Sequence, residues 1–161
     1  MHVPHRILIV QIALRISLAA AFLSAVADRF GWWAPFGQGA WGSMEAFADY
    51  AHQLVPFASG WFLNVIVWGA TVTESSLGAL LLLGWRPKLV GAVTCLVLII
   101  FGIAMAVSLG MESPLSYSVF SAASAAAAYA IIDTTSQSNA SESRRGARRV
   151  QAEHSKPVQA D

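Results

Sequence analysis

The sequence predicts an all-α membrane protein, a four-transmembrane-helix bundle with a short amphipathic helix in the first external loop. Three observations predict this class. The chain of 161 residues is 56% hydrophobic and 12% charged, about half the charge of ordinary soluble domains. Its apolar residues gather in stretches close to the roughly 20 residues that cross a bilayer. Its polar residues gather near the end, which divides the chain into a transmembrane domain, 1–132, and a disordered cytoplasmic tail, 133–161.

Four apolar stretches are candidate spans, and each must be helical because lipid offers no water to open backbone groups. They cover residues 7–27, 61–83, 89–109 and 115–132, the last being shorter and rich in alanine and serine. The first stretch also has features of a secretory signal, with Arg6 before it and Ala25-Val26-Ala27 as a cleavage site. Arg15, in the middle of the apolar residues, argues against cleavage, so we expect a retained span.

Basic residues predict the orientation, because cytoplasmic loops of membrane proteins carry an excess of Lys and Arg. With four spans, eight of the ten basic residues fall on one side: Arg6, Arg86, Lys88, Arg144, Arg145, Arg148, Arg149 and Lys156. Arg29 falls on the other side, and Arg15 lies within the first span. We therefore expect a multi-pass protein with both termini in the cytoplasm.

The connection between the first two spans, residues 28–60, is long and predicted to lie outside. Its candidate functional residues are Asp28, Arg29, Trp32 and Trp41, the tryptophans suiting the headgroup level of a membrane. The stretch SMEAFADYAHQL then repeats apolar residues at helical spacing. Ser43 can cap this helix and Pro56 follows its end. We expect a short amphipathic helix on the membrane surface or over the bundle, as a plain lid or as a gate.

Two charges lie inside the predicted spans, Arg15 in the first and Glu74 in the second. Counted from the cytoplasmic ends of their helices, they lie about eight and ten residues deep, roughly 12 and 15 Å at 1.5 Å per residue. An unpaired charge at the bilayer centre costs at least ~3 kcal/mol. We therefore predict that Arg15 and Glu74 form an ion pair between adjacent antiparallel helices.

Polar side chains lie near this predicted pair. Tyr117 and Ser118, at the outer start of the fourth stretch, could line a shallow cavity. The candidate ligand-binding or ion-pair residues are Arg15, Glu74, Gln11, Thr71, Ser75, Tyr117 and Ser118. Two interpretations stay open. The pair either fixes the register of the helices, or it belongs to a site that binds a polar head or relays a proton.

Several kinds of chemistry find no support in the sequence. No histidine lies in an apolar stretch, which argues against haem and against familiar copper or iron sites. There is no P-loop and no Gly-x-Ser-x-Gly nucleophile turn. The single cysteine, Cys95, cannot form an internal disulfide or a CxxC pair. We expect an accessory subunit more than an enzyme, with no metal site, no assigned catalytic residue and no nucleic-acid partner.

Three stretches stand out by their order and spacing: LRISLAAAFLSAVADRFGWW, TVTESSLGALLLLGWRPK and MESPLSYSVFSAASAAAA. Together they resemble the DoxX family of membrane proteins (DoxX/DoxD-like), over about residues 10–132. The positions that match the family's recurring residues are Arg15, Asp28, Arg29, Thr71, Glu74, Gly78, Pro114, Tyr117 and Ser118. The resemblance implies a four-helix fold in the bacterial cytoplasmic (inner) membrane. The chain departs from redox-active relatives because it lacks their cysteine pairs.

The resemblance also implies a redox-associated role, because the family includes the small subunit of an archaeal thiosulfate:quinone oxidoreductase. In a first hypothesis the protein is a membrane subunit or anchor of a redox-associated complex, with quinone as its cofactor. In a second it is a binding or transport module for a lipid or another small amphiphile, with Arg15 and Glu74 in its cavity. The expected partners are membrane lipid, a redox enzyme, or a second copy of the chain in a homo-oligomer.

Overall fold

The computed structural model describes residues 5–132 and residue 151, and every regular element in these residues is helical. The elements are α1 (His5–Arg29), the 3-10 helix η1 (Ala34–Phe36), α2 (Met44–Leu54), α3 (Gly60–Leu83), α4 (Pro87–Leu109), α5 (Glu112–Ser116) and a last helix, Val119–Ile132. The all-α prediction is therefore confirmed. The predicted disordered tail, 133–161, lies outside the described residues except for residue 151.

Three of these helices, α1, α3 and α4, are long and apolar enough to cross a membrane. Their outer surfaces suit lipid, because large apolar side chains such as Ile9, Val72 and Val107 stay exposed. A water-soluble domain rarely leaves so many apolar side chains uncovered in contiguous patches. The chain therefore has the character of a membrane protein.

The predicted fourth span differs from the structure at its start. The sequence predicts one helix from residue 115, whereas Leu115 belongs to α5 and a new helix begins at Val119. The break lies at Ser118, whose φ of 55° is left-handed and cannot continue a right-handed helix. Within the described residues, the last helix is apolar and covers a shorter stretch than α1, α3 and α4.

The turn between α3 and α4 is tight. Gly84 ends α3 with a φ of 67°, and its N–H donates to the carbonyls of Leu80 and Leu81. This conformation is nearly free of strain for glycine and satisfies carbonyls left open at a helix end. Pro87 then begins α4, where its missing N–H removes no helical hydrogen bond. The two helices therefore form an antiparallel hairpin.

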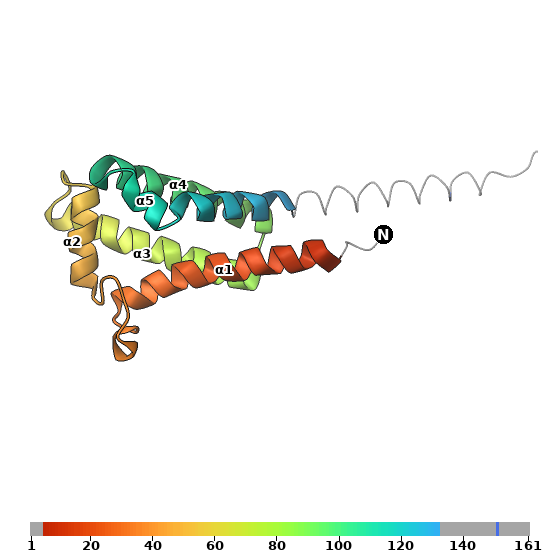
Figure 1. Cartoon of the computed structure of the whole chain (residues 1–161), viewed down its shortest axis with the longest axis horizontal. Helices are drawn as coiled ribbons and strands as arrows, with labels where there is room; N and C mark the ends of the chain where they lie inside the picture. Colours follow the sequence, from red (N-terminus) through yellow and green to blue (C-terminus); the bar gives the residue numbers. More distant parts are fainter. Residues whose placement is uncertain (1–4, 133–150, 152–161) are drawn as a thin grey trace, which may run out of the picture.

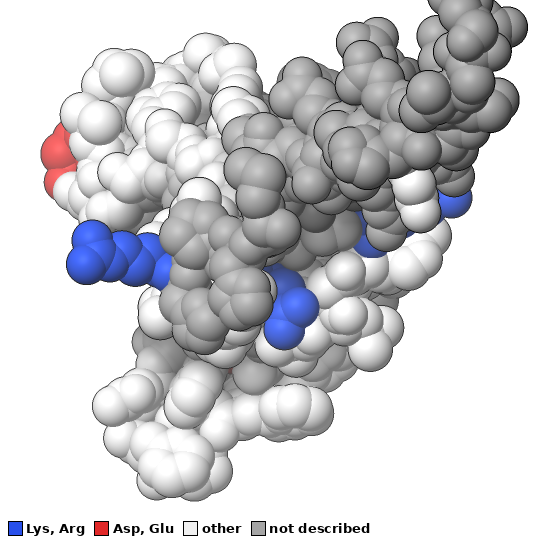
Figure 2. Space-filling model, turned by 90° about the vertical axis from the view of Figure 1, so that its right-hand side faces the viewer, with Lys and Arg blue, Asp and Glu red and all other residues white. Residues whose placement is uncertain are grey.

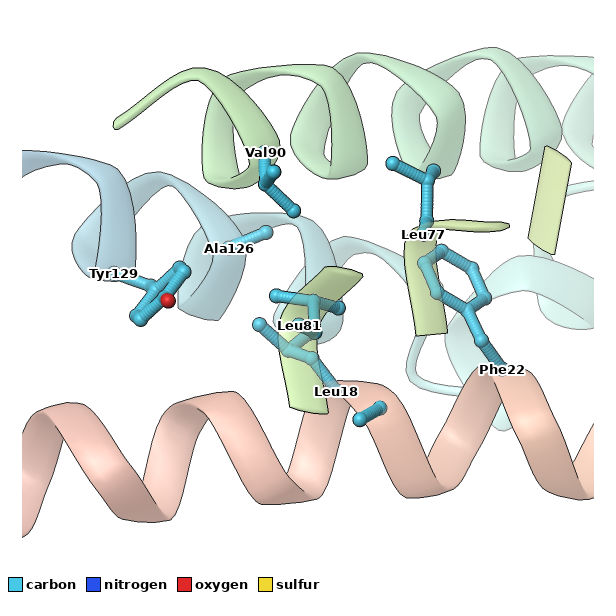
Figure 3. Close-up of a cluster of buried hydrophobic side chains, with 8 residues drawn as sticks. Leu18, Phe22, Leu77, Leu81, Val90, Ala126 and Tyr129 are labelled. Atoms are coloured by element: carbon cyan, nitrogen blue, oxygen red, sulfur yellow. The ribbon is translucent and has the colours of Figure 1, made fainter. Parts of the chain in front are cut away.

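Figure 1 shows α1, α3, α4 and the last helix running along the long axis, while α2 lies across one end of them. One core joins the four lengthwise helices (Figure 3). Its members are Leu18, Ala19 and Phe22 of α1, Leu77 and Leu81 of α3, Val90 of α4, and Ala126 and Tyr129 of the last helix. A smaller core joins α2 to α3 through Phe47, Ala51 and Val67. The predicted amphipathic helix is thus confirmed as α2, packed over the bundle.

Small residues allow the lengthwise helices to approach closely. A Cβ on Gly78 of α3 would lie 2.8 Å from the side chain of Leu23 of α1, so a larger residue there would require Leu23 to move. Basic side chains lie at the opposite end from α2, where α1 begins and α3 meets α4 (Figure 2). Arg6 is at the start of α1, and Arg86 and Lys88 are at the turn into α4.

Candidate functional site

Glu74 forms an ion pair with Arg29. The Nη2 of Arg29 donates to both carboxylate oxygens of Glu74, at 2.8 and 2.7 Å. Its Nη1 donates to Thr71 Oγ1 at 3.0 Å, and that hydroxyl donates to the carbonyl of Val67 at 2.8 Å. Arg29 and Glu74 are each only 3% exposed. The charges are therefore taken out of solvent together, with a hydroxyl as a third partner.

The antiparallel register of α1 and α3 explains this pairing. Gly78 lies against Ala19 and Leu23, and Gly84 lies against Arg15, so residue numbers fall along α1 as they rise along α3. Side chains of a helix lean toward its own N-terminus. Arg29, at the last position of α1, therefore leans back toward the middle of the bundle. Glu74 leans toward the end that carries α2, and the two side chains meet.

The predicted pair between Arg15 and Glu74 is wrong. The Arg15 guanidinium lies beside Gly84, about ten residues or roughly 15 Å along α3 from Glu74. The prediction assumed that the two helices end at the same level, whereas the start of α1 extends past the end of α3. Arg15 instead lies at the C-terminus of α3, where the helix dipole favours a cation. Its Nε is buried without a hydrogen-bond partner in the described residues.

The other residues predicted for the Arg15–Glu74 site lie in different parts of the structure. Gln11 precedes Arg15 by one helical turn and lies still farther from Glu74. Thr71 does join the ion pair, whereas the Ser75 hydroxyl donates to the Thr71 carbonyl of its own helix at 2.7 Å. Tyr117 lines a cavity beside the pair. Ser118 is exposed, and its left-handed backbone forms the break before the last helix.

Asp28, next to Arg29, organises the loop. Its buried carboxylate accepts hydrogen bonds from three consecutive backbone N–H groups, those of Ala40 at 2.8 Å, Trp41 at 2.9 Å and Gly42 at 3.3 Å. The part of the loop just before α2 is thereby held against the end of α1, with Trp41 facing inward. Trp32, the other predicted loop residue, is 69% exposed and takes no part in the site.

Aromatic rings of the loop and α2 cover the ion pair. The guanidinium carbon of Arg29 lies 3.6 Å from the ring centroid of Phe47 and 5.6 Å from that of Trp41, which is within the range of cation–π attraction. Trp41 also packs edge-on against Phe47 at 5.0 Å and against Tyr50 at 5.6 Å. Ser43 fixes the start of α2 by accepting the Ala46 N–H at 3.1 Å. These contacts hold an aromatic roof over Arg29.

A cavity of about 440 Å³ lies beside the pair and under this roof. Its lining includes Leu18, Phe22, Ala25, Arg29, Trp41, Phe47, Tyr50, Val67, Glu74, Phe101, Met105, Tyr117 and Ala122. Residues of α1, α2, α3, α4 and the last helix all contribute. Figure 1 shows α1 and α4 separating toward the end where α2 lies across them. The volume is within the range of small-molecule sites, and the mostly apolar lining is typical of them.

Two tyrosines, Tyr50 of α2 and Tyr117, are among the residues that line the cavity. Burial raises the pKa of Tyr50 above its ordinary value of 10.0, and Tyr117 raises it further, while a hydrogen bond with Ser113 acts in the opposite direction. Tyr50 is therefore protonated and able to donate at neutral pH. The sequence did not point to Phe47 and Tyr50 as site residues, although their helical spacing placed them on α2.

Neither a resident metal nor a relative identifies the site. Within residues 5–132 and 151, no three His, Cys, Asp or Glu side chains group as metal ligands would. No protein family, curated protein or solved structure matches the chain. The resemblance to the DoxX family consequently stays a prediction. The geometry supports non-covalent binding of a mainly apolar molecule, with a few polar contacts near Arg29.

Proposed function

We propose that the protein binds a small amphiphilic molecule inside the membrane, in the cavity beside the Arg29–Glu74 pair. The observation that carries this proposal is an apolar cavity with one buried, hydrogen-bonded ion pair in its wall. Intramembrane charges are costly and commonly mark binding or transport paths. The proposal keeps the lipid-like or metabolite-like ligand of the second hypothesis, with Arg29 in place of Arg15.

The proposal includes a four-span topology with both termini in the cytoplasm. Three helices have the length and composition of spans, and the shorter last helix packs in the same core through Ala126 and Tyr129. It is the natural fourth crossing. Basic residues at the end opposite α2 support a cytoplasmic position for that end. The loop 30–43 and α2 then lie on the external side of a bacterial inner membrane.

A quinone-linked membrane subunit of a redox complex is a second candidate. One observation favours it, namely the aromatic roof of Trp41, Phe47 and Tyr50 on one side of the cavity. Flat aromatic rings pack well against such side chains. In this form of the proposal the ligand is a quinone, and a redox enzyme or a second copy of the chain docks on the membrane domain.

Native mass spectrometry of gently solubilised protein tests the proposal, since it reports ligand and stoichiometry together. The decisive variant is Ala104→Phe, because Ala104 lines the cavity, and its matched control is Ala92→Phe, an exposed position on the same helix. We expect wild type and Ala92→Phe to retain a bound amphiphile and Ala104→Phe to lose it. Equal retention by all three proteins would overturn the proposal. A bound quinone with a copurifying redox enzyme would assign the second candidate.

A further inference from the structure

We propose that the cavity selects an uncharged long-chain molecule over a charged one. This inference rests on the proposed function and names the chemical class of the ligand. Three observations carry it. They are the charge balance of the cavity wall, the hydrogen bonds of the Glu74 oxygens, and the burial of the polar atoms beside the cavity.

The charges in the cavity wall compensate each other. Among the described residues that line the cavity, Arg29 and Glu74 are the charged ones. They hold each other through a single guanidinium nitrogen at 2.7 and 2.8 Å. The wall is therefore close to neutral. A charged ligand would lose its hydration in this apolar space and meet no uncompensated opposite charge in return.

The side-chain oxygens of Glu74 and Thr71 are hydrogen-bonded to the Arg29 guanidinium. Both Glu74 oxygens accept from Arg29 Nη2, and Thr71 Oγ1 accepts from Arg29 Nη1 while its own proton goes to Val67. The charge of Glu74 is consequently matched by a guanidinium in direct contact. A cationic ligand group, such as an ammonium, finds no uncompensated carboxylate there.

The polar atoms of the pair are themselves covered. The Nε–H of Arg29 is fully buried, and the rings of Phe47 and Trp41 lie over the guanidinium. Most of the residues that line the cavity are apolar. A ligand that enters therefore gains apolar contacts and no ionic ones.

The test compares three probes with the same chain length: 1-decanol, decanesulfonate and decyltrimethylammonium. The two ions keep their charges at any working pH. Binding to the full chain in nanodiscs is measured by native mass spectrometry, with each Kd corrected for partition of the probe into lipid. We expect wild type to bind decanol at least about tenfold more tightly than either ion. A charged probe that binds as tightly as decanol overturns this inference and leaves the proposed function standing. Failure of all three probes to bind overturns the proposed function itself.

Two variants test whether the Arg29–Glu74 pair determines the order in which the three probes bind. Glu74→Gln leaves the Arg29 charge alone, so decanesulfonate should become the tightest probe. Arg29→Gln leaves the Glu74 charge alone, so decyltrimethylammonium should become the tightest. Arg15→Gln is the matched control, because Arg15 lies outside the cavity lining and should keep the wild-type order. An equal loss of all three probes in both Glu74→Gln and Arg29→Gln would show a purely structural pair. If either variant fails to fold, the wild-type order alone decides.

Discussion

At the scale of single residues, the main result is that the last residue of α1 supplies the counter-charge for Glu74. The Arg29–Glu74 pair is buried, doubly hydrogen-bonded and covered by Phe47. Removing one partner of such a pair leaves a buried charge alone, which costs more than the intact pair contributes. The matching depths of Arg15 and Glu74 gave the wrong partner, because residue counts from helix ends do not contain the offset between two packed helices.

The pair should therefore show strong coupling in a double-mutant cycle. We expect Arg29→Met and Glu74→Leu each to lower the free energy of unfolding by roughly 3–5 kcal/mol, and the double variant to recover most of it. The measurement is reversible unfolding in detergent. The control cycle uses Arg15→Met with Glu74→Leu, whose effects should add within about 0.5 kcal/mol, because the two sites are far apart. Coupling in the control cycle would contradict the observed register.

Tyr50 gives a prediction on alkaline pH. Its pKa is raised in the folded protein by burial and by Tyr117, so folding favours the protonated hydroxyl. A raised folded-state pKa contributes stability that is present below the unfolded value near pH 10 and is lost as pH rises through the folded value. We expect wild type to lose stability more steeply above about pH 10 than Tyr50→Phe. Melting temperatures from pH 8 to 11 measure this, and parallel curves would contradict it.

At the scale of elements, the sequence predicted helices well and their contacts poorly. Ser43 is a strong local signal, and it does cap the start of α2. The break at Ser118 was missed, because a left-handed serine has no distinctive pattern in a run of small residues. The covering of Arg29 by Phe47 was also missed, since it depends on how α2 lies across the bundle. Such contacts come from packing and not from local sequence.

The packing of α1 on α3 predicts different results for two glycines of the same helix. A Cβ on Gly78 would lie 2.8 Å from Leu23, whereas a Cβ on Gly69 would meet open space. We expect Gly78→Ala to destabilise the protein by about 1–3 kcal/mol, because Leu23 must move. Gly69→Ala should be neutral or stabilising by up to about 1 kcal/mol, since alanine favours a helix. Detergent melting measures both, and equal effects would contradict the close approach.

At the scale of the whole molecule, the distribution of charge and hydropathy along the chain accounts for most of what the sequence predicts about the fold. The apolar stretches gave the three helices of span length almost to their ends. The candidate site could not be predicted in the same way. Its residues come from five helices and surround a cavity whose shape depends on how those helices pack. Only Glu74, Thr71, Tyr117, Trp41 and Arg29 among its members were candidates beforehand, and Arg29 was expected in a loop.

The proposed topology is tested by cysteine labelling. In a Cys95→Ala background, single cysteines at Gln38 and Arg86 should react with a membrane-impermeant maleimide from opposite sides, because they lie in turns at opposite ends of the helices. Gln38 should be labelled from outside and Arg86 only in inverted vesicles. Labelling of both positions from one side would rule out the antiparallel crossing of α1 and α3. Residue 150, in the predicted cytoplasmic tail, lies outside the described residues.

The distance along the chain between Arg29 and Glu74 also bears on how the protein is made. The partners are 45 positions apart, and synthesis delivers the N-terminal helix first. When α3 enters the bilayer, its carboxylate carries a penalty of about 3 kcal/mol on insertion scales. That penalty is relieved only if α1 is still next to the insertion site and Arg29 is not yet paired. In the proposed topology, we therefore expect α1 to bind α3 as it enters the membrane during biogenesis. A chain shortened to begin after α1 would insert α3 poorly, although the hydropathy of α3 would be unchanged.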